Sequence, residues 1–233
     1  YQNEKRSCAF FRDCYYTLLN YFGQQVRFSG RKFRFKNAVY ALDSTIITLC
    51  AEVYDWAYYT YSKGAVKLHT LLNFSTLLPE YVHITDGKAG DNTAARHVQV
   101  KPGSIVVSDR GYFDTRLLNF WDSTKVFFVV RVKDNLIYER MEERDLPDKA
   151  HPEVLIDEIV ILKGNGTAGQ YPIPIRRIAV YNARHDFTIE LLTNNMKLSA
   201  GTIAVVYKAR WDVEVFFRNL KQNFHIKSFG GTS

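Results

Sequence analysis

Apolar side chains recur at helical spacing near both ends of the chain. Over Ser7–Phe22 they return about every three or four residues, which predicts an amphipathic helix with Gly23 as its stop signal. Over Val206–Phe224 the same spacing predicts a second helix. The core-facing line of this helix consists of Val206, Val213, Phe217, Leu220 and Phe224.

Short apolar runs bounded by polar residues predict strands between these helices. Ala38–Leu42 is one such run, and it ends at Asp43. Ser104–Ser108 (SIVVS) is another, with the continuous apolar centre expected of a strand buried on both faces of a sheet, and it ends at Asp109. Strands mixed with helices indicate an α/β fold.

The pattern changes from about Val126 to Asn195. Strand-like runs alternate with turns there, and no helical period of useful length is present. This stretch therefore predicts a β-rich module inserted into the α/β domain. Two short helices are predicted ahead of it: one at Asp91–Val98 with Asp91 or Asn92 as its cap, and one that Asp114 or Thr115 caps and that runs through Phe120.

The composition is that of an ordinary globular protein. Of the 233 residues, 46% are hydrophobic and 24% are charged, which excludes wholesale disorder. No apolar run approaches the roughly 20 residues of a membrane span, so we expect no membrane partner. Three cysteines, Cys8, Cys14 and Cys50, lack metal-type spacing and predict buried, reduced thiols in a cytosolic protein.

The net charge of +7 is concentrated at the two ends of the chain. Residues 1–37 hold eight Lys/Arg against two Asp/Glu, residues 207–233 hold five against two, and the remainder is slightly acidic. Localised basic charge indicates a polyanionic partner such as nucleic acid. Ser29–Asn37 alternates aromatic and basic residues, which fits a basic arm on phosphates and a soluble edge strand equally well.

Four polar residues share one stripe of the C-terminal helix. At about 100° per residue they lie within roughly 60° of one another along the edge of its apolar face. They are Tyr207, Arg210, Glu214 and Lys221. One acid beside two cations and a phenol suits a phosphodiester and a metal ion. The alternative is a surface helix with an ordinary Arg210–Glu214 pair.

Three carboxylates are set apart by their positions. Asp43 lies at the end or in the middle of one predicted strand, Asp109 lies at the C-terminal end of another, and Glu214 lies on a helix that must pack against the sheet. Sites assemble at the carboxyl ends of strands in an open α/β sheet, and carboxylate oxygens suit Mg²⁺ or Mn²⁺. Two such ions would activate a water or 3′-hydroxyl on one side of a phosphorus and stabilise the leaving oxygen on the other. Taken singly, each Asp is more commonly a helix cap or turn former; together with the cationic stripe, the acids favour a metal site.

The segment YKARWDVEVFFRNLK places Tyr207, Arg210, Glu214 and Lys221 in the order Tyr-x2-Arg-x3-Glu-x6-Lys. This order resembles the YREK signature of bacterial insertion-sequence transposases with a DDE catalytic domain. YALDST around Asp43 and IVVSDRGYFD around Asp109 resemble the strands that carry the first two acids of that family. KGAVKLHTLL resembles its third strand, and LTNN resembles the segment before its terminal helix. The resemblance covers the chain from about Phe35 onward.

The resemblance implies an RNase H-like fold, a mixed sheet flanked by helices and interrupted by a β-rich insertion. Asp43 would lie on the first strand, Asp109 after the fourth, and Glu214 on a late helix. The implied parts are an N-terminal helix and basic linker (1–37), a first core part (38–122), the insertion (123–197) and a second core part with the signature helix (198–233). Family members usually have further segments before and after these parts, so we expect this chain to be a portion of a longer enzyme.

The resemblance also implies a chemistry. Two Mg²⁺ or Mn²⁺ ions would be bound by Asp43, Asp109 and Glu214. Phosphates of the transposon end would be held by Tyr207, Arg210 and Lys221. The reaction would be hydrolytic strand cleavage at the ends of the element, followed by attack of the freed 3′-hydroxyl on target DNA. The partner would be double-stranded DNA, bound by a homodimer in the bacterial cytoplasm at the nucleoid.

Two other functions compete with this one. The chain would be a DNA-binding remnant that no longer cuts, or an RNase H-like nuclease acting on RNA–DNA hybrids. The presence of all the acids and all the phosphate-contacting positions disfavours the remnant, and the signature helix and long insertion disfavour the nuclease. Further candidates for the site or for DNA contact are Lys67, His69, Arg110 and Tyr112.

Overall fold

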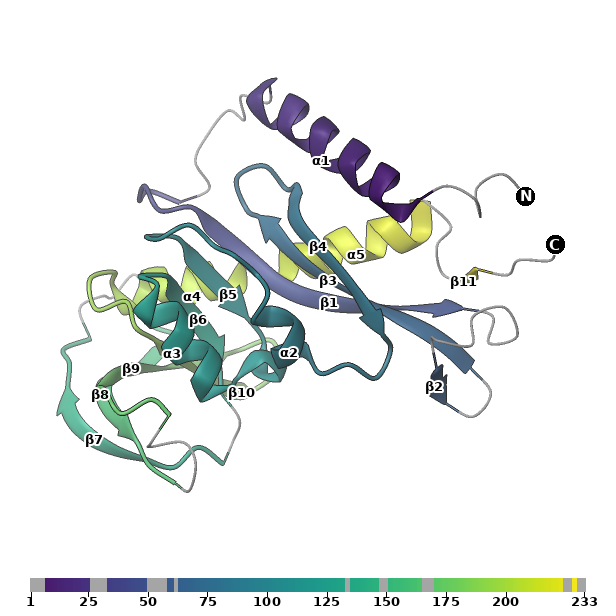
Figure 1. Cartoon of the computed structure of the whole chain (residues 1–233). Coiled ribbons are helices and arrows are strands. Elements are labelled where there is room, and N and C mark those ends of the chain that lie inside the picture. The colour runs from purple at the N-terminus through teal and green to yellow at the C-terminus, as the bar shows by residue number, and fades with distance from the viewer. Residues whose placement is uncertain are drawn as a thin grey trace.

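The computed structural model describes residues 7–25, 33–49, 58–60, 63–132, 135–146, 151–164, 170–223 and 228–229. Its centre is one long mixed β-sheet with helices on both faces (Figure 1). This is the α/β class, with a mixed sheet flanked by helices, that the sequence predicts.

Five strands form the core of the sheet. In spatial order they are β4 (Pro79–Asp86), β3 (Lys63–Asn73), β1 (Val39–Leu49), β5 (Ile105–Ser108) and β6 (Phe127–Arg131). β1, β5 and β6 run parallel, whereas β3 is antiparallel to β1 and to β4. In chain order β5 is the fourth of these strands, and Asp109 follows it directly, as predicted for an RNase H-like sheet. Two short strands, β2 (Tyr58–Thr60) and β11 (Ser228–Phe229), pair with β3 and β1.

The β-rich region continues the same sheet beyond β6. Its strands are, in spatial order, β10 (Phe187–Thr193), β9 (Ile175–Asn182), β8 (Val154–Leu162) and β7 (Tyr138–Glu143). Each is antiparallel to its neighbour, and β10 pairs with β6. β6 itself lies inside the 123–197 unit suggested by the sequence but pairs with β5. The insertion is therefore joined to the core by main-chain hydrogen bonds.

Helices cover the two faces of this sheet and give each face its own hydrophobic core. One face carries α2 (Asp91–Ala95) and α3 (Thr115–Ser123), and its core includes Leu117 and Trp121. The other carries α4 (Ala200–Lys208) and α5 (Trp211–Asn223), and its core includes Val206 and Phe217. A further helix, α1 (Cys8–Gln25), lies near β4 (Figure 1), where the Tyr15 hydroxyl donates to the carbonyl of Pro79.

Two helix-end predictions are wrong. α1 runs through Gly23 to Gln25, because a glycine weakens a helix without necessarily ending it. α2 is capped by Gly90 rather than by Asp91 or Asn92, and no side chain bonds to the free amides at its start. By contrast, the sequence pattern that predicts a helix after Asp114 is confirmed, since the Asp114 carboxylate accepts from the amide of Leu117 at 3.0 Å.

The N-terminal basic segment is described from residue 33 and forms bends rather than a strand. The rings of Phe33 and Phe35 stack with their centroids 5.3 Å apart and pack on the core. Arg34 and Lys36 are exposed. The alternation therefore sorts aromatic side chains inward and cations outward without any strand.

The cysteine prediction fails where the structure tests it. Cys8 and Cys14 are free thiols, but both are exposed on α1 rather than buried; Cys50 lies outside the described residues. None of the helices in the described ranges is long and apolar enough to cross a membrane.

Candidate active site

The alternation of side chains along β1 decides which face its polar residues reach. Val39 and Ala41 belong to the core under α4 and α5, whereas Tyr40 and Leu42 belong to the core under α2 and α3. Successive side chains of a strand point to opposite faces. Asp43 therefore points toward α4 and α5.

Asp109 is the neighbour of Asp43 at the end of the next strand. β1 and β5 are parallel, and their last registered pair is Leu42 with Ser108. The next residue of each strand is an aspartate, so the two carboxylates follow side by side. Val107, two residues before Asp109, packs in the core under α4 and α5, so the alternation directs Asp109 to the same face as Asp43.

Arg210 and Glu214 reach this face from the junction of α4 and α5. The amide of Arg210 donates to the carbonyl of Tyr207 at 2.9 Å, and the amide of Val213 donates to the carbonyl of Arg210 at 3.0 Å. These are i→i+3 bonds, tighter than those of an α-helix. The single helix predicted at Val206–Phe224 is therefore wrong: it is two helices joined by a turn that contains Arg210.

One guanidinium joins two of the acids that the sequence predicts for the site. Arg210 Nη1 donates to Asp43 Oδ2 at 3.0 Å, and Arg210 Nη2 donates to Glu214 Oε1 at 2.6 Å. The Glu214 contact is an ordinary i,i+4 pair, but the Asp43 contact spans 167 positions of sequence. The side chains are 15% exposed for Arg210, 17% for Asp43 and 33% for Glu214. The fold thus brings Asp43 of β1 and Glu214 of α5 to one partly buried place.

Burial raises the pKa of Asp43 from an ordinary 3.8 to about 6. The Ser44 amide, which donates to Asp43 Oδ1 at 2.8 Å, and the Arg210 guanidinium both oppose the rise. The negative charges of Asp109 and Glu214 add to it. The cluster therefore holds more negative charge than its guanidinium neutralises, which favours a further cation.

Tyr207 and Lys221 flank this cluster in different ways. Tyr207 is buried, with its ring centroid 5.9 Å from the guanidinium carbon of Arg210. Burial raises the pKa of its hydroxyl, although Arg210 opposes the rise. Lys221 is half-buried on α5, and burial lowers the pKa of its ammonium group.

The donor set suits a hard divalent cation. Asp43 and Glu214 already converge on one cation, the Arg210 guanidinium, through carboxylate oxygens of the kind that Mg²⁺ and Mn²⁺ prefer. As the side chains stand, no three acidic, histidine or cysteine residues of the described ranges have a metal-binding arrangement. The residues fit the ion by their chemistry, with Arg210 lying where their charges converge.

The family model described as the transposase DDE domain matches residues 34–232. This chain belongs to that family. The resemblance drawn from the sequence motifs is thereby confirmed at the level of the family.

Curated relatives of this transposase domain agree with that assignment. The protein y4zB of Sinorhizobium fredii, assigned as a transposase, is 30% identical over 232 residues, which cover 99% of this chain and 63% of y4zB. The transposase assigned to insertion sequence element IS5377 of Geobacillus stearothermophilus is 29% identical over 207 residues, covering 89% of this chain and 54% of that protein. The chain thus spans between 54% and 63% of the length of these two relatives.

Among solved structures, the piggyBac transposase in its synaptic complex with hairpin DNA resembles this domain remotely. The TM-score is 0.46 at 10% sequence identity, over 80% of this chain and 41% of the piggyBac chain. A likeness of that degree carries no argument about the site.

A second polar cluster lies on the opposite face of the transposase domain. Ser44, the residue after Asp43, points toward α2, where its hydroxyl donates to Asp91 Oδ1 at 2.7 Å. Lys67 Nζ lies 2.9 Å from the same oxygen, and His69 Nδ1 lies 3.6 Å from it. Because its carboxylate serves these partners, Asp91 does not cap α2.

Sequence reasoning missed Asp91 and Ser44 in this cluster. Strand pairing was the signal available: Ser44 is registered opposite His69, and Lys67 lies two residues before His69 on the same face. Burial lowers the pKa of His69 to about 4, so the imidazole is neutral at physiological pH.

The remaining two predicted neighbours of the acids differ in exposure. Tyr112 is buried, and burial raises the pKa of its hydroxyl, with the charges of Asp91, Asp43 and Asp109 adding to the rise. Arg110 is exposed in the short turn that follows Asp109. Tyr112 therefore lies in the core under α2 and α3, beneath the sheet face opposite to that of Asp43, and Arg110 lies at the surface.

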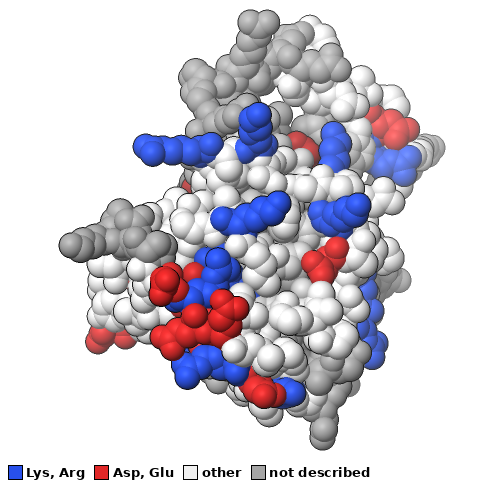
Figure 2. Space-filling model, turned by 90° about the vertical axis from the view of Figure 1, so that its left-hand side faces the viewer, with Lys and Arg blue, Asp and Glu red and all other residues white. Residues whose placement is uncertain are grey.

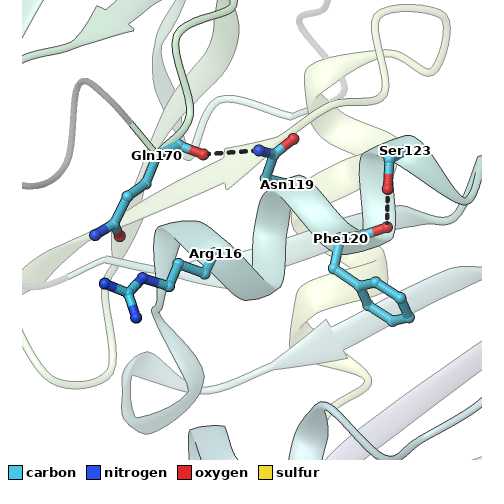
Figure 3. A pocket seen from close by; sticks show the side chains of 5 residues that line it. All are labelled: Arg116, Asn119, Phe120, Ser123 and Gln170. Carbon is cyan, nitrogen blue, oxygen red and sulfur yellow. Dashed lines mark hydrogen bonds between the residues drawn. The ribbon is translucent and has the colours of Figure 1, made fainter.

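An open hollow on α3 contains none of these acids. It is lined by Arg116, Asn119, Phe120, Ser123 and Gln170 (Figure 3). The Asn119 side chain donates to the carbonyl of Gln170 at 2.9 Å, and the Ser123 hydroxyl donates to the carbonyl of Phe120 at 2.8 Å. Its polar groups bond to neighbouring backbone, and the hollow is not part of the candidate active site.

Proposed function

We propose that this chain forms the catalytic core of an enzyme that cleaves DNA strands at the ends of an insertion sequence and joins the freed 3′-hydroxyl to target DNA. The observation that carries the proposal is the convergence of Asp43, Arg210 and Glu214 on one face, with Asp109 at the neighbouring strand end. Such an enzyme must hold a phosphodiester and a metal ion side by side. Acids and a cation brought together from positions far apart in sequence supply both needs.

We assign the divalent ions, two of Mg²⁺ or Mn²⁺, to Asp43, Asp109 and Glu214. Bound there, the ions would lower the pKa of an attacking water or 3′-hydroxyl and stabilise the leaving oxygen. Asp43 lies within β1 and Asp109 directly follows the neighbouring β5, and the Ser44 amide donates to one oxygen of Asp43. Burial of Asp43 keeps water from competing for its carboxylate.

Arg210 and Lys221 hold the phosphates of the DNA strand in this proposal. The planar fork of Arg210 suits bidentate contact with phosphate oxygens, whereas Lys221 supplies a point charge farther along α5. Tyr207 is buried beneath Arg210, so its contribution is to orient the guanidinium and to offer its hydroxyl. Double-stranded DNA then approaches from the side of α4 and α5.

The insertion end of the molecule is less suited to DNA. Figure 2 shows this end, with Lys and Arg mostly in the upper half and acidic side chains gathered in the lower half. β7, at the left-hand edge of Figure 1, exposes Glu139, Glu142 and Glu143. Acidic surface repels phosphates. We infer that the insertion (123–197) faces away from the duplex and that residues 38–122 and 198–233 supply the site. The N-terminal helix and linker (1–37) add basic charge. A homodimer brings the two transposon ends together at the nucleoid.

Replacing Asp109 by Asn tests the metal role. With a plasmid carrying the element, we expect Mg²⁺-dependent strand cleavage to fall to roughly one hundredth or less, because a metal ligand is lost. DNA affinity should stay equal or rise, since one negative charge is removed. Glu142→Gln, which removes one charge from the exposed surface of β7, is the matched control and should cleave normally. Cleavage surviving in Asp109→Asn removes Asp109 from the site, and DNA binding without any cleavage by the unaltered chain identifies the non-cutting alternative.

Replacing Lys221 by Ala tests the phosphate role. We expect DNA binding to weaken by a similar factor for all sequences, and the salt dependence of the logarithm of affinity to become shallower by about one unit. Fluorescence anisotropy over a salt series measures both. Lys101→Ala, which removes the same charge from the turn before β5, should leave the salt slope unchanged. A loss that depends on base sequence would mean that Lys221 reads bases instead.

A further inference from the structure

Arg210 occupies two of the oxygens that the proposed metal ions require. Its guanidinium contacts Asp43 Oδ2 at 3.0 Å and Glu214 Oε1 at 2.6 Å. A guanidinium carries positive charge and only donors, so it cannot share these oxygens with a divalent ion at the same distance without repulsion. In this conformation, Arg210 and a metal ion are alternatives for the same pair of carboxylates.

Arg210 is held by its backbone in the turn and by contacts of its guanidinium. Its backbone amide bonds to the Tyr207 carbonyl at 2.9 Å in the turn between α4 and α5, and its guanidinium carbon is 5.9 Å from the Tyr207 ring centroid. The guanidinium contacts are made by the end of a long side chain that is 15% exposed. Rotation about the side-chain bonds of Arg210 would move the guanidinium and leave the backbone of the turn in place.

The charge of the cluster calls for more than one cation. Asp43 and Glu214 share one guanidinium and Asp109 lies beside Asp43, so one positive charge stands against three carboxylates when all are ionised. Arg210 therefore neutralises part of the cluster, and a divalent ion neutralises it more fully. A guanidinium displaced by that ion needs another anion, and a DNA phosphate is the anion that the proposed function supplies.

We propose that Arg210 is a placeholder cation: it holds Asp43 and Glu214 together in the metal-free chain and transfers its guanidinium to a DNA phosphate when a divalent ion takes those oxygens. The inference rests on the proposed function and adds a coupling to it. Without DNA, Arg210 competes with the metal. With DNA, the phosphate relieves this competition, so DNA strengthens metal binding, and by thermodynamic reciprocity metal strengthens DNA binding by the same factor.

Calorimetric titration of the full chain with Mn²⁺, at about pH 8 so that Asp43 is ionised, tests the competition. We expect Arg210→Gln to bind Mn²⁺ about fivefold or more tightly than the unaltered chain in the absence of DNA, within the usual range of couplings between sites. Adding a short DNA duplex should tighten Mn²⁺ binding by the unaltered chain and leave Arg210→Gln unchanged. Arg218→Gln, which replaces an exposed arginine of the following helix α5, is the matched control and should behave as the unaltered chain.

The outcomes separate the inference from the proposed function. Equal or weaker Mn²⁺ binding by Arg210→Gln overturns the placeholder role and leaves the metal site standing. No Mn²⁺ binding by either protein, with or without DNA, overturns both.

A crystal structure of the unaltered chain with Mn²⁺ gives a measurement that does not depend on the variant folding. Arg210 displaced from Asp43 in the metal-bound state supports the placeholder role. Mn²⁺ bound to Asp43 with both guanidinium contacts kept overturns it.

Discussion

The surroundings of Asp43 disfavour the ionised form of its carboxyl group. Because burial raises its pKa to about 6 from 3.8, the folded chain holds this proton more strongly than the unfolded chain does. Protonation of Asp43 therefore favours folding, fully so below pH 3.8, and this contribution is lost as the pH rises through about 6. Above that pH the buried, ionised carboxylate of Asp43 destabilises the folded chain.

Asp43→Asn should remove that cost. In the absence of divalent ions the variant should be more stable than the unaltered chain at about pH 8, and the difference should shrink toward about pH 4, where Asp43 of the folded chain has taken up its proton. A pKa difference of about two corresponds to roughly 3 kcal/mol, and the lost contact with Arg210 makes this an upper bound. Urea unfolding at several pH values measures the difference. The exposed control Glu142→Gln should show no such trend, and a difference independent of pH would contradict the assignment.

Single residues differ in how far the sequence predicts them. Apolar runs mark the strands that carry Asp43 and Asp109, but only Asp109 follows the end of its strand, because β1 continues through Asp43 to Leu49. The bridge from Arg210 to Asp43 spans 167 positions, and nothing local in the sequence encodes it. The sequence predicts Asp91 as a helix cap because short polar residues at the start of a helix commonly cap it. The pairing of Asp91 with Lys67 depends instead on how β3 lies beside α2.

At the scale of elements, the hydrophobic pattern does not show the break between α4 and α5. Val206, Val213 and Phe217 are all buried on one face, so the apolar spacing continues across the turn. Backbone hydrogen bonds between residues i and i+3 replace the i, i+4 bonds of an α-helix there. The backbone path changes, but the same side chains face inward. The predicted site residues thus stay together, but Tyr207 belongs to a different helix from Glu214.

Arg176 of β9 links the insertion to the start of α4. Its guanidinium is 1% exposed and makes two 2.7 Å bonds to the carboxylate of Asp157 on β8. It also donates to the carbonyls of Asn195 and Leu198, just ahead of α4, at 3.0 and 2.6 Å. One buried ion pair therefore holds the segment from which the signature helices begin.

Arg176→Met should destabilise the chain by about 3–5 kcal/mol, because Asp157 is left buried without its charge partner. Arg144 Nε, 4.0 Å from Asp157, offers partial compensation and favours the lower end of that range. Arg176→Met with Asp157→Leu should recover part of the loss, since no unpaired charge remains. Arg140→Ala, which breaks an exposed pair with Glu143, should cost about 1 kcal/mol or less. Equal losses in the single and double variants would contradict the buried-charge explanation.

At the scale of the whole molecule, the insertion and the catalytic core share both sheet and interior. Leu192 of β10 is registered opposite Val130 of β6, and the Asn194 side chain accepts from the amide of Phe128 at 3.0 Å. The hydrophobic core under α3 contains Leu117 together with residues of β8, β9 and β10. The sequence pattern marks the strands of this region but not their pairing with the core, because strand pairing across a long connection leaves no local pattern.

The shared sheet predicts that the insertion and the core unfold as one cooperative unit. Separating β10 from β6 would expose a strand edge and open the common core, so neither part is expected to remain folded alone. Urea unfolding followed by circular dichroism and by tryptophan fluorescence, which reports Trp121 on α3 and Trp211 on α5, should give one coincident transition. Native-state hydrogen exchange should show similar opening free energies for amides of β9 and β1. Asn194→Ala, which removes the side-chain bonds to Phe128, Asp122 and Val126, should lower both together. Amides of β9 that exchange at a much lower free energy than those of β1 would show instead that the insertion folds as an independent domain.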